Sequence, residues 1–469
     1  MAKLNLFKRA QVDMVNGPLL KNIIKFAIPF VLSNLFQTFF NAADLAIVGS
    51  FCGSANVAAV GATGVLSRLI VGMFVGLGTG AGVVVAHAIG ARDNDAVSKT
   101  VHSAITTALI GGVFLTFFGF FTCEYFLGLM KTPPDIIALS TLYMKIYFVG
   151  IIPMLLYNFG AAILRASGDS QSPLIYLTLA GFINVGLNIV FVTVFDMTVD
   201  GVAWATTISQ TFSAVMVIRA LMKRSDACRL VLDKLRIYKK QFFKILAIGI
   251  PSGIQGAMFS ISNLTIQTAV NSFASTAINS GHATGASIES FIYMVGMAMQ
   301  QTSANFIGQN VGARNYKRLR KIAFVCLACV LVFYAAAGTF VYIFGEQQLG
   351  LYIKDSAEAI EWGMLRFGIL CPSMILCAVM DVMGGSLRGL GKATTSMLMS
   401  VLGVCGIRLL WVNTVFRMPQ YHTMQVLYYS FPISWGITMV LQFTAFMIVT
   451  AKMIKLWKKE EQAALIENA

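Results

Sequence analysis

The feature that most restricts the fold of this chain is a series of long apolar segments without a charged residue. Each has a length near the ~20 residues that an α-helix needs to cross a ~30 Å hydrocarbon core. Charged residues make up only 12% of the 469 residues, about half of the roughly 25% that is usual in soluble domains. The segments therefore predict a polytopic membrane protein. They run over 26–43, 45–67, 69–91, 103–123, 146–164, 170–195, 201–218, 290–313 and 322–345, and two longer ones cover 245–288 and 418–451.

The alternation of these segments with polar loops predicts an all-α fold of twelve transmembrane helices. The N-terminal arm is polar and basic and lacks an apolar core before a small-residue cleavage site, so it is not expected to be a secretory signal peptide. The first helix should therefore be retained. The predicted helices cover 20–44, 55–88, 98–122, 136–158, 170–195, 201–222, 242–270, 283–310, 320–344, 360–383, 393–415 and 424–454.

Lysine and arginine gather in alternate loops. They occupy the N-terminal arm, the C-terminal tail and every second loop, whereas the intervening loops hold only Lys131, Lys354 and Arg417. By the positive-inside bias, both termini are expected in the cytoplasm and the chain in the plasma membrane, the inner membrane of the cell. The net charge of +15 is then a consequence of topology. Its expected partner is anionic lipid headgroups and not nucleic acid.

The sequence repeats itself at an offset of about 222 residues. The segment AIGARDND at 88–95 is echoed by NVGARNYK at 310–317, with Gly90 expected to end a helix in a left-handed conformation. Further matches are Pro29 with Pro251, GATG at 61–64 with HATG at 282–285, and LRASG at 164–168 with LRGLG at 387–391.

Each copy of the repeat holds six predicted helices, an even number, so the two copies share one orientation in the membrane. They are expected to form two six-helix lobes related by a pseudo-two-fold axis along the membrane normal, with the substrate cavity between them. The predicted organisation is an N-terminal lobe at 1–222, an amphipathic cytoplasmic linker at 223–244 and a C-terminal lobe at 245–469 with a basic cytoplasmic tail.

In this order the motifs resemble the multidrug and toxic compound extrusion (MATE) family, and the resemblance covers nearly the whole chain. It depends on NAADLAIVG at 41–49, on the two G-A-R-D/N turns, and on LRASGDSQSP and LRGLGKATT after the fourth and tenth helices. It implies a transporter of the bacterial type with its carboxylate in the N-terminal lobe. Such a protein is not an enzyme. It is a monomeric antiporter without a cofactor, exporting amphipathic, often cationic drugs in exchange for Na⁺ or H⁺ by alternating access.

Asp44 is the candidate coupling residue. A carboxylate late in an apolar helix costs roughly 2.5 to 3.5 kcal/mol at a central position and is retained mostly where it faces a cavity or a partner. The alternative is that the first helix ends before Asp44, which then faces water. The resemblance implies a cation site here that also includes Asn184, Asn188 and Thr206.

Asn184 and Asn188 lie at i and i+4, on one face of the fifth predicted helix. Asn188 stands where many relatives carry a second Asp, so a single Na⁺ or a single proton would neutralise the site. We therefore expect one monovalent charge per transport cycle here and no proton shared between two acids. The sequence leaves both ions open.

Three further features are candidates for a role in transport. Pro29 removes a backbone hydrogen bond and predicts a kink, either static or linked to the state of Asp44. Asp381 is the only acid deep in the tenth predicted helix, and its alternative role is a structural one near Arg388. Arg68 and Glu289 occupy equivalent repeat positions, which predicts either a gating ion pair across the cleft or separate local partners.

Two other classes of protein are weighed against the antiporter. A flippase for lipid-linked saccharides, from the same wider superfamily, would line its cavity with several cations, for which Arg68, Arg366 and Arg408 are available. A membrane-embedded enzyme would need a constellation of acids, His or Ser that is not visible.

The eight Cys are expected to be small buried hydrophobes, because they show neither disulfide nor metal spacing. His102 is expected to be solvated near the cytoplasmic start of the third helix.

Overall fold

The computed structural model describes residues 11–130 and 132–467, and every regular element within them is a helix. Contacts divide the chain into two compact units. The first unit reaches Gly253 but excludes 18–23, and the second contains 18–23 and everything from Ile254 onward. The structure gives no side-chain positions for Ser54, Ala55, Val65, Leu66, Arg68, Leu69, Ala464, Leu465 and Glu467.

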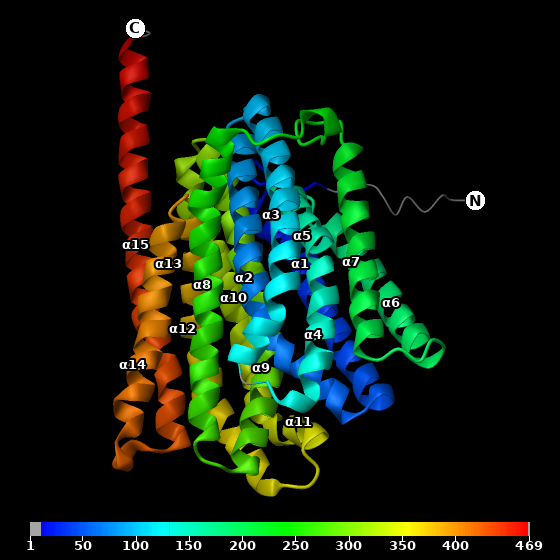
Figure 1. Ribbon diagram of the computed structural model, residues 1–469. Helices are drawn as coiled ribbons and strands as arrows, with labels where there is room; N and C mark the ends of the chain where they lie inside the picture. The colour runs from blue at the N-terminus through cyan, green and yellow to red at the C-terminus, as the bar shows by residue number, and fades with distance from the viewer. Residues whose placement is uncertain (1–10, 131, 468–469) are drawn as a thin grey trace, which may run out of the picture. The chain divides into compact units, whose positions relative to one another are not determined.

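The helices of the first unit follow the predicted order. They are α1 (Leu19–Ile47), a π-helical turn (Val48–Cys52), α2 (Ser54–Gly90), α3 (Asn94–Leu129), α4 (Pro134–Val149), α5 (Ile151–Ala166), α6 (Gln171–Thr193) and α7 (Val199–Met222). Helices α6 and α7 pack along each other, and α5 packs against α2, α3 and α7. Figure 1 shows α6 and α7 as neighbours joined by a short connection.

The prediction of a single helix over 136–158 is wrong. The segment belongs to two helices, α4 and α5, which meet at Gly150 with a bend of 46°. A Cβ atom at Gly150 would lie 2.8 Å from the Thr207 hydroxyl on α7. The absence of a side chain therefore lets this junction approach α7 closely.

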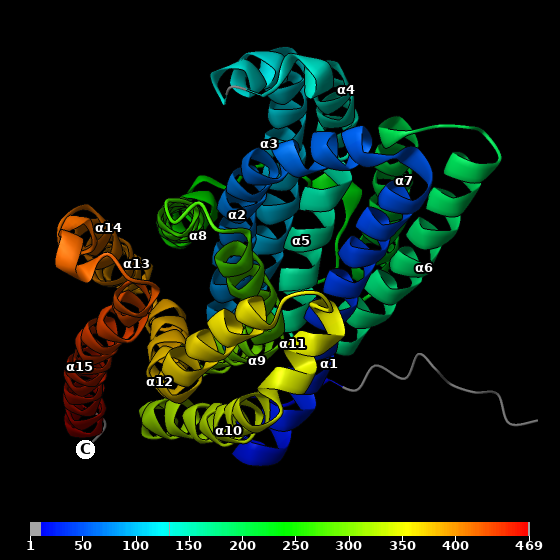
Figure 2. The ribbon, with the colours of Figure 1, turned by 90° about the horizontal axis from the view of Figure 1, so that it is seen from below.

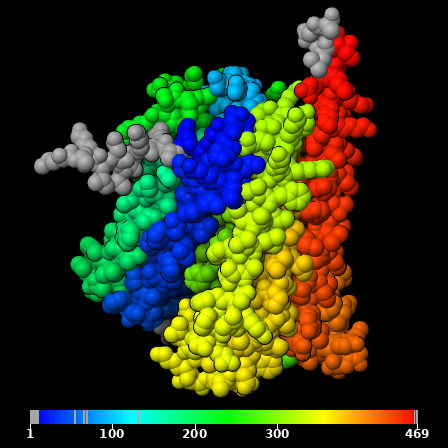
Figure 3. All heavy atoms as spheres, turned by 180° about the vertical axis from the view of Figure 1, so that it is seen from behind, coloured from blue at the N-terminus to red at the C-terminus, as the bar shows by residue number. Residues whose placement is uncertain are grey.

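The second unit holds a second series of helices. They are α8 (Lys239–Asn271, which begins in the first unit), α9 (Thr276–Gly312), α10 (Tyr316–Ile343), α11 (Gly345–Tyr352), α12 (Ala357–Gly389), α13 (Ala393–Ser400), a π-helical segment (Val401–Gly406), α14 (Ile407–Asn413) and α15 (Met424–Glu467). Helix α12 packs against α9, α10 and α15 (Figure 2). Figure 3 shows α10 beside α15 on one face of this unit. The short helix α11 was not predicted.

Length and hydropathy support the predicted membrane fold. Within the described residues, ten helices are long and apolar enough to cross a membrane, and the bent pair α4 and α5 brings the number to eleven. Helix α9, the eighth predicted span, does not meet this test although it has 37 residues. Its inner face is polar, with buried Glu289, Thr302 and Asn305 among others. The all-α membrane fold is confirmed.

The two copies of the repeat form the same turns. Arg92 after α2 and Arg314 after α9 both adopt left-handed backbone angles, with φ of 56° and 52°. The left-handed residue is thus the arginine, and the expectation for Gly90 is wrong. Gly168 and Gly391, after α5 and α12, have φ of 90° and 76°. The duplication therefore extends from the sequence to the backbone conformation of both turns.

The linker after α7 packs on α3 of the first unit. His102, expected to be solvated, is 1% exposed. Its Nε2 accepts a hydrogen bond from the Val231 amide at 3.0 Å, and the Tyr238 amide donates to the Ser103 hydroxyl at 2.9 Å. The linker has no α-helix of its own, only a short 3₁₀ turn at Leu232–Lys234.

The start of α8 also belongs to the first unit. A Cβ atom on Gly76 of α2 would lie 2.2 Å from the backbone nitrogen of Gly253, and one on Gly80 would lie 2.6 Å from that of Gly249. These four glycines bring the backbones of α2 and α8 together. The division between the two compact units therefore falls inside α8. The predicted bounds of the lobes stay a prediction.

A partly buried ion pair lies within the linker. Arg224 is 3% exposed, and its Nε donates to Asp226 Oδ1 at 2.8 Å while Nη2 donates to Oδ2. Partial burial alone would raise the pKa of Asp226, but the Arg224 hydrogen bonds and charge and the Cys228 amide lower it below its ordinary value. The pair therefore contributes stability above the unfolded pKa of about 4, which is lost as pH falls through the lower folded pKa.

Asp226→Asn is expected to loosen the linker, because it leaves the Arg224 guanidinium buried without a carboxylate. Asp226 is about half exposed and water screens the pair, so we expect roughly a tenfold faster hydrogen exchange at 228–231, or about 1.4 kcal/mol. Hydrogen exchange with mass spectrometry at neutral pH measures the change. Asp233→Asn, on an exposed residue of the same linker, is the control, and equal exchange in the two variants would contradict the assignment.

Candidate functional site

The end of α1 carries Asp44 within the helix. Helix α1 continues to Ile47 and passes directly into the π-helical turn Val48–Cys52, which ends at Gly53 with φ 81°. Val48 is fully buried and packs with Val192 of α6 and Val202 of α7. The first helix therefore does not end before Asp44, and the π-helical turn fastens this region to the helices that carry the other candidate residues.

The structure brings all four residues of the candidate coupling site together. The Asn188 amide nitrogen donates to Asp44 Oδ1 and lies 3.4 Å from Asn184 Oδ1. The Asn184 amide nitrogen in turn donates to the Thr206 hydroxyl at 3.3 Å, and Thr206 donates to the Val202 carbonyl at 2.9 Å. A continuous hydrogen-bonded chain thus joins α1, α6 and α7.

Burial is deepest at the centre of this chain. Asn188 is fully buried, Asn184 is 5% exposed, and Asp44 and Thr206 are half-buried. The Asn188 side-chain oxygen has no hydrogen-bond partner among the described atoms. Such an atom is costly to bury, roughly 1 to 3 kcal/mol, and calls for an explanation such as a bound ion or an exchangeable proton.

Tyr143 of α4 is a neighbour of this site that the sequence did not reveal. It lies close enough to Asp44 for the carboxylate charge to act on it, and its ring stacks with that of Tyr147 at 6.3 Å between centroids. Nothing in the local sequence around Tyr143 distinguishes it from other membrane tyrosines. Its proximity to Asp44 arises only because α4 packs against α7 and α2.

The chemistry of the site is that of oxygen ligands around a single acid. The side chains of Asp44, Asn184, Asn188 and Thr206 offer carboxylate, amide and hydroxyl oxygens, which suit a hard cation. They suit a protonated carboxyl group equally well, because amide and hydroxyl oxygens accept hydrogen bonds. No group of three His, Cys, Asp or Glu side chains in the described part of the chain forms a metal site.

Pro29 lies inside α1 without interrupting it. The carbonyl of Pro29 accepts a hydrogen bond from the Ser33 hydroxyl at 2.8 Å. The guanidinium carbon of Arg165 lies over the neighbouring Phe30 ring, 4.9 Å from the centroid of that ring. Arg165 lies in the last turn of α5, within the LRASG motif at 164–168, so this motif contacts α1 next to the proline. A bending role for Pro29 stays a prediction.

Glu289 has a local partner in the second unit. Arg366 of α12 donates from Nε to Glu289 Oε1 at 3.1 Å and from Nη2 to Oε2 at 2.7 Å, and both side chains are buried. Arg366 Nη1 also faces His282 Nδ1 at 3.2 Å. The side chain of Arg68 lies outside the described residues, so the predicted gating pair stays untested. Its alternative, a local partner, holds for Glu289.

Asp381 of α12 forms a second polar group in this unit. Its carboxylate accepts from the Gln300 amide at 3.2 Å and from the Cys377 thiol at 3.7 Å. Arg388 lies close enough for its charge to act on Asp381 but donates its hydrogen bond to Gln255, at 3.3 Å. Asp381 thus has polar partners on α9 and α12, and its role in transport stays a prediction.

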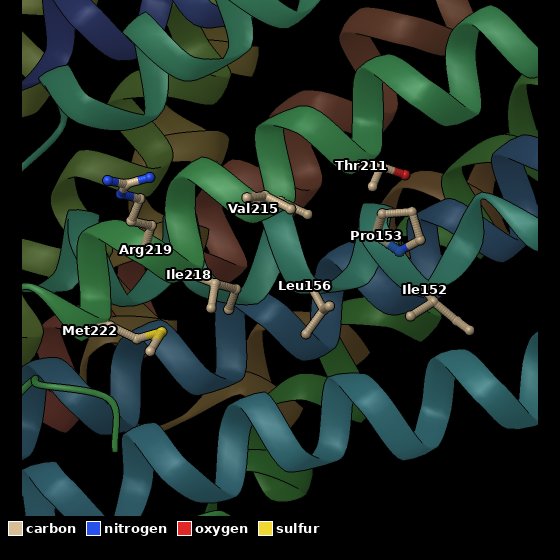
Figure 4. Close-up of a pocket in the computed structure, with 9 residues that line it drawn as sticks. Ile152, Pro153, Leu156, Thr211, Val215, Ile218, Arg219 and Met222 are labelled. Carbon is tan, nitrogen blue, oxygen red and sulfur yellow. The ribbon is translucent and has the colours of Figure 1, made fainter. Parts of the chain in front are cut away.

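An apolar groove of about 400 Å³ lies between α5 and α7 of the first unit (Figure 4). Arg219 and Met222 lie at one end of it and Thr211 at the other. Its other lining residues are Ile152, Pro153, Leu156, Ala214, Val215 and Ile218. The groove contains no carboxylate and does not include Asp44, so it is suited to hydrocarbon chains and is separate from the candidate coupling site.

Comparison with known protein families agrees with this duplicated architecture. The sequence model of the family named MatE matches residues 29–190 and again residues 251–412. The two matches are separated by the same offset as the repeat, and together they cover more than half of the chain. The chain belongs to the MATE family. The duplication found in the sequence therefore coincides with two successive matches to the model of this MATE protein's family.

Relatives of this MATE protein extend over nearly its whole length. It is 24% identical to the probable multidrug resistance protein YoeA of Bacillus subtilis over 453 residues, covering 94% of this chain and 95% of that protein. It is 25% identical to the probable multidrug resistance protein NorM of Thermotoga maritima, covering 83% and 84%. A multidrug resistance MATE transporter solved in an outward-facing conformation has a TM-score of 0.87 at 20% identity, covering 95% and 99%. The MATE fold and a multi-pass membrane protein are thereby shown.

Proposed function

We propose that this MATE protein is a secondary active antiporter that exports amphipathic, often cationic organic compounds in exchange for Na⁺ or H⁺. The observation that carries the proposal is the hydrogen-bonded group around Asp44, with Asn188, Asn184 and Thr206. An ionisable group inside a membrane helix is expensive and marks an ion or proton pathway by default. The names of the relatives support drug export as the physiological role.

The topology proposed from the sequence accompanies this function. The protein would lie in the plasma membrane as a monomer with both termini in the cytoplasm, in contact with anionic lipids and not with nucleic acid. It would work by alternating access and without an enzymatic reaction. Its only small inorganic partner would be the coupling ion, which is a transported substrate and not a cofactor.

The Asn188 amide supports a mechanism for ion coupling. Its NH₂ group donates to Asp44, an arrangement that fits an ionised carboxylate because a carboxylate can only accept hydrogen bonds. Rotating the amide by half a turn would direct its oxygen, now buried without a partner, toward Asp44. That orientation fits either a protonated Asp44 or a Na⁺ shared by the two oxygens. Each state of Asp44 thus has an amide orientation that satisfies it.

The proposal requires that the occupied and empty forms of the Asp44 site stabilise different conformations of the protein. A group can couple an ion to transport only if its occupied and empty forms stabilise different conformations. The chain of hydrogen bonds from Asp44 to Val202 connects the end of α1 to α6 and α7. Neutralising Asp44 changes the first bond of that chain, and the change is passed to helices that carry no charge of their own at the site.

Purified protein in proteoliposomes tests the proposed function. Export of ethidium or norfloxacin is measured with an imposed Na⁺ gradient, an imposed H⁺ gradient or neither, at matched membrane potential. We expect one of the two gradients to drive export against the substrate gradient. Equal export in all three conditions would contradict an antiporter and would favour a uniporter.

Asn188→Asp tests the expectation of one charge per cycle. The substitution places a second acid against Asp44, and two carboxylates that share a site cannot both stay ionised at ordinary pH. We expect wild-type protein to exchange one monovalent ion per cycle at this site and the variant to change that number or to stop cycling. The reversal potential of substrate flux in proteoliposomes gives the stoichiometry. A value above one in the wild type would refute the expectation.

The alternative of a lipid-linked saccharide flippase is weakened by the environment of Arg366. That role needs several free cations, and the Arg366 charge is neutralised by Glu289. Translocation of a fluorescent lipid-linked saccharide across the same proteoliposomes distinguishes the two classes. Ion-independent saccharide flipping without drug export would favour the flippase.

A further inference from the structure

The interior of the second unit contains more buried positive charge than negative charge. Three arginines are almost completely buried there, with Arg366 5%, Arg388 6% and Arg408 3% exposed. Only two acids, Glu289 and Asp381, act on these guanidinium groups. One buried cation of the three is therefore left without a carboxylate of its own.

Arg408 is that cation. Its Nε donates to the Ser434 hydroxyl at 3.1 Å, and no described residue accepts a hydrogen bond from its two terminal nitrogens. None of the ion pairs among the described residues includes Arg408. The ionisable groups that act on it are Tyr293, two cysteines and the like charge of Arg366.

Aromatic rings compensate the Arg408 charge only in part. The guanidinium carbon lies 4.1 Å from the centroid of the Phe431 ring and 5.6 Å from that of Trp435. A desolvated cation–π contact is worth about 2 kcal/mol or more, whereas burying an unpaired charge costs several kcal/mol. The rings therefore offset only part of the cost of burying this charge, and an added negative charge would stabilise it further.

An irregular stretch of helix holds Arg408 in this position. Arg408 is the second residue of α14 and follows the π-helical segment Val401–Gly406. A π-helical turn inserts extra backbone into an α-helix, rotates the residues beyond it, and occurs frequently at functional sites. Gly403 within it packs on Thr438 of α15, where a Cβ atom would lie 2.2 Å from the hydroxyl. Figure 2 shows α14 and α13 beside α15.

We propose that Arg408 is an anion-binding site that recognises an organic oxyanion attached to an aromatic or aliphatic body. The two free terminal nitrogens form the planar fork that binds a carboxylate, sulfonate or phosphate through two parallel hydrogen bonds. The rings of Phe431 and Tyr293 each meet that of Trp435 edge to face, so the side chains around the guanidinium are apolar and favour an oxyanion with an apolar body. The inference rests on the proposed transport function and extends its substrate class from cations to amphipathic anions.

Equilibrium binding of a matched pair of probes tests this site. The protein is placed in nanodiscs of zwitterionic phosphatidylcholine, which has no net charge, and is titrated with two probes. Dansylglycine carries a carboxylate, and dansylglycine amide has the same body without the charge. We expect the wild type to bind the carboxylate at least tenfold more tightly than the amide. We expect Arg408→Gln to lose that preference while its affinity for the amide stays unchanged.

Two further variants keep the result interpretable. Arg408→Lys keeps the charge but not the planar fork, and it should retain part of the preference even if the Gln variant does not fold. Arg417→Gln removes an exposed arginine on the connection that follows α14, and it should bind both probes like the wild type. Equal affinity of the wild type for the two probes, or an unchanged preference in Arg408→Gln, would overturn the proposal.

Repeating the titration in nanodiscs that contain phosphatidylglycerol distinguishes the sources of the oxyanion. A lipid phosphate at Arg408 would compete with dansylglycine in the wild type and not in Arg408→Gln, whereas a site for soluble anions would be insensitive to the lipid. Both outcomes support anion binding at Arg408. Because binding is measured without a gradient, equal affinity of the wild type for the two probes refutes this inference alone. Loss of gradient-driven export in the wild type with probe binding intact refutes the proposed antiport alone.

Discussion

In the Asp44→Asn variant, the stimulation of export by an imposed Na⁺ or H⁺ gradient is expected to disappear. The amide has nearly the same shape as the carboxylate and can still contact Asn188, so the packing of α1, α6 and α7 should be preserved. It cannot gain or lose a proton at ordinary pH and is a weaker ligand for Na⁺. Site-to-site coupling is typically worth 1 to 3 kcal/mol, or about 5- to 150-fold in affinity, and this is the factor that the variant should lose.

The measurement compares dye export from proteoliposomes with and without the gradient, together with dye affinity at equilibrium. The affinity for the dye in the absence of a gradient should change little, because the substitution alters the ion site and not the dye-binding site. Asp135→Asn, which removes an exposed carboxylate at the start of α4 in the same unit, is the matched control and should retain full stimulation. Full stimulation in Asp44→Asn would remove Asp44 from the coupling mechanism.

The helices could be predicted from the sequence because membrane burial selects for length and for absence of charge, both of which are local properties. The bend at Gly150 could not be predicted, because the close approach of this junction to Thr207 on α7 depends on the packing of another helix. Helix α9 is a predicted span that does not meet the test of length and hydropathy. It was predicted from the gap in charges after Glu289, but its buried face, which includes Glu289, Thr302 and Asn305, is polar. The partners of these residues are known only from the packing of α9 on other helices such as α12.

Part of the candidate site could be predicted from the sequence. Asp44 was found as a carboxylate late in an apolar helix, and Asn184 and Asn188 share one face of a helix by geometry. The family resemblance joined these residues and Thr206 into one predicted site. Tyr143 was missed because it belongs to no motif and reaches the site only through the packing of α4.

The contact between Glu289 and Arg366 could not be predicted from the repeat. Equal positions in a repeat are equal in sequence register, and register does not determine which side chains meet. The partner that Glu289 contacts is Arg366, 77 residues away on α12, and no periodicity in the sequence connects the two. The contact becomes visible only when the packing of α9 on α12 is known.

Glu289→Gln is expected to destabilise the second unit by about 3 to 5 kcal/mol, the usual cost of removing one partner from a buried ion pair. The cost arises from Arg366, which would keep its charge at 5% exposure without a carboxylate. His282 cannot replace the acid. A guanidinium only donates hydrogen bonds, so the Nδ1 atom that faces Arg366 must be an unprotonated, neutral acceptor. Tyr428 and Phe431 offer ring faces at 5.5 and 5.6 Å, which are weaker still.

Thermal unfolding in detergent, followed by tryptophan fluorescence, measures this cost, and the double variant with Arg366→Met identifies its cause. Replacing a whole buried pair by apolar side chains is often neutral, so the double variant should unfold at a higher temperature than Glu289→Gln alone. Asp95→Asn breaks an exposed pair with Lys99 and, as the matched control, should cost less than about 1 kcal/mol. If the double variant were no more stable than the single one, the loss would come from packing around Glu289 and not from an orphaned charge.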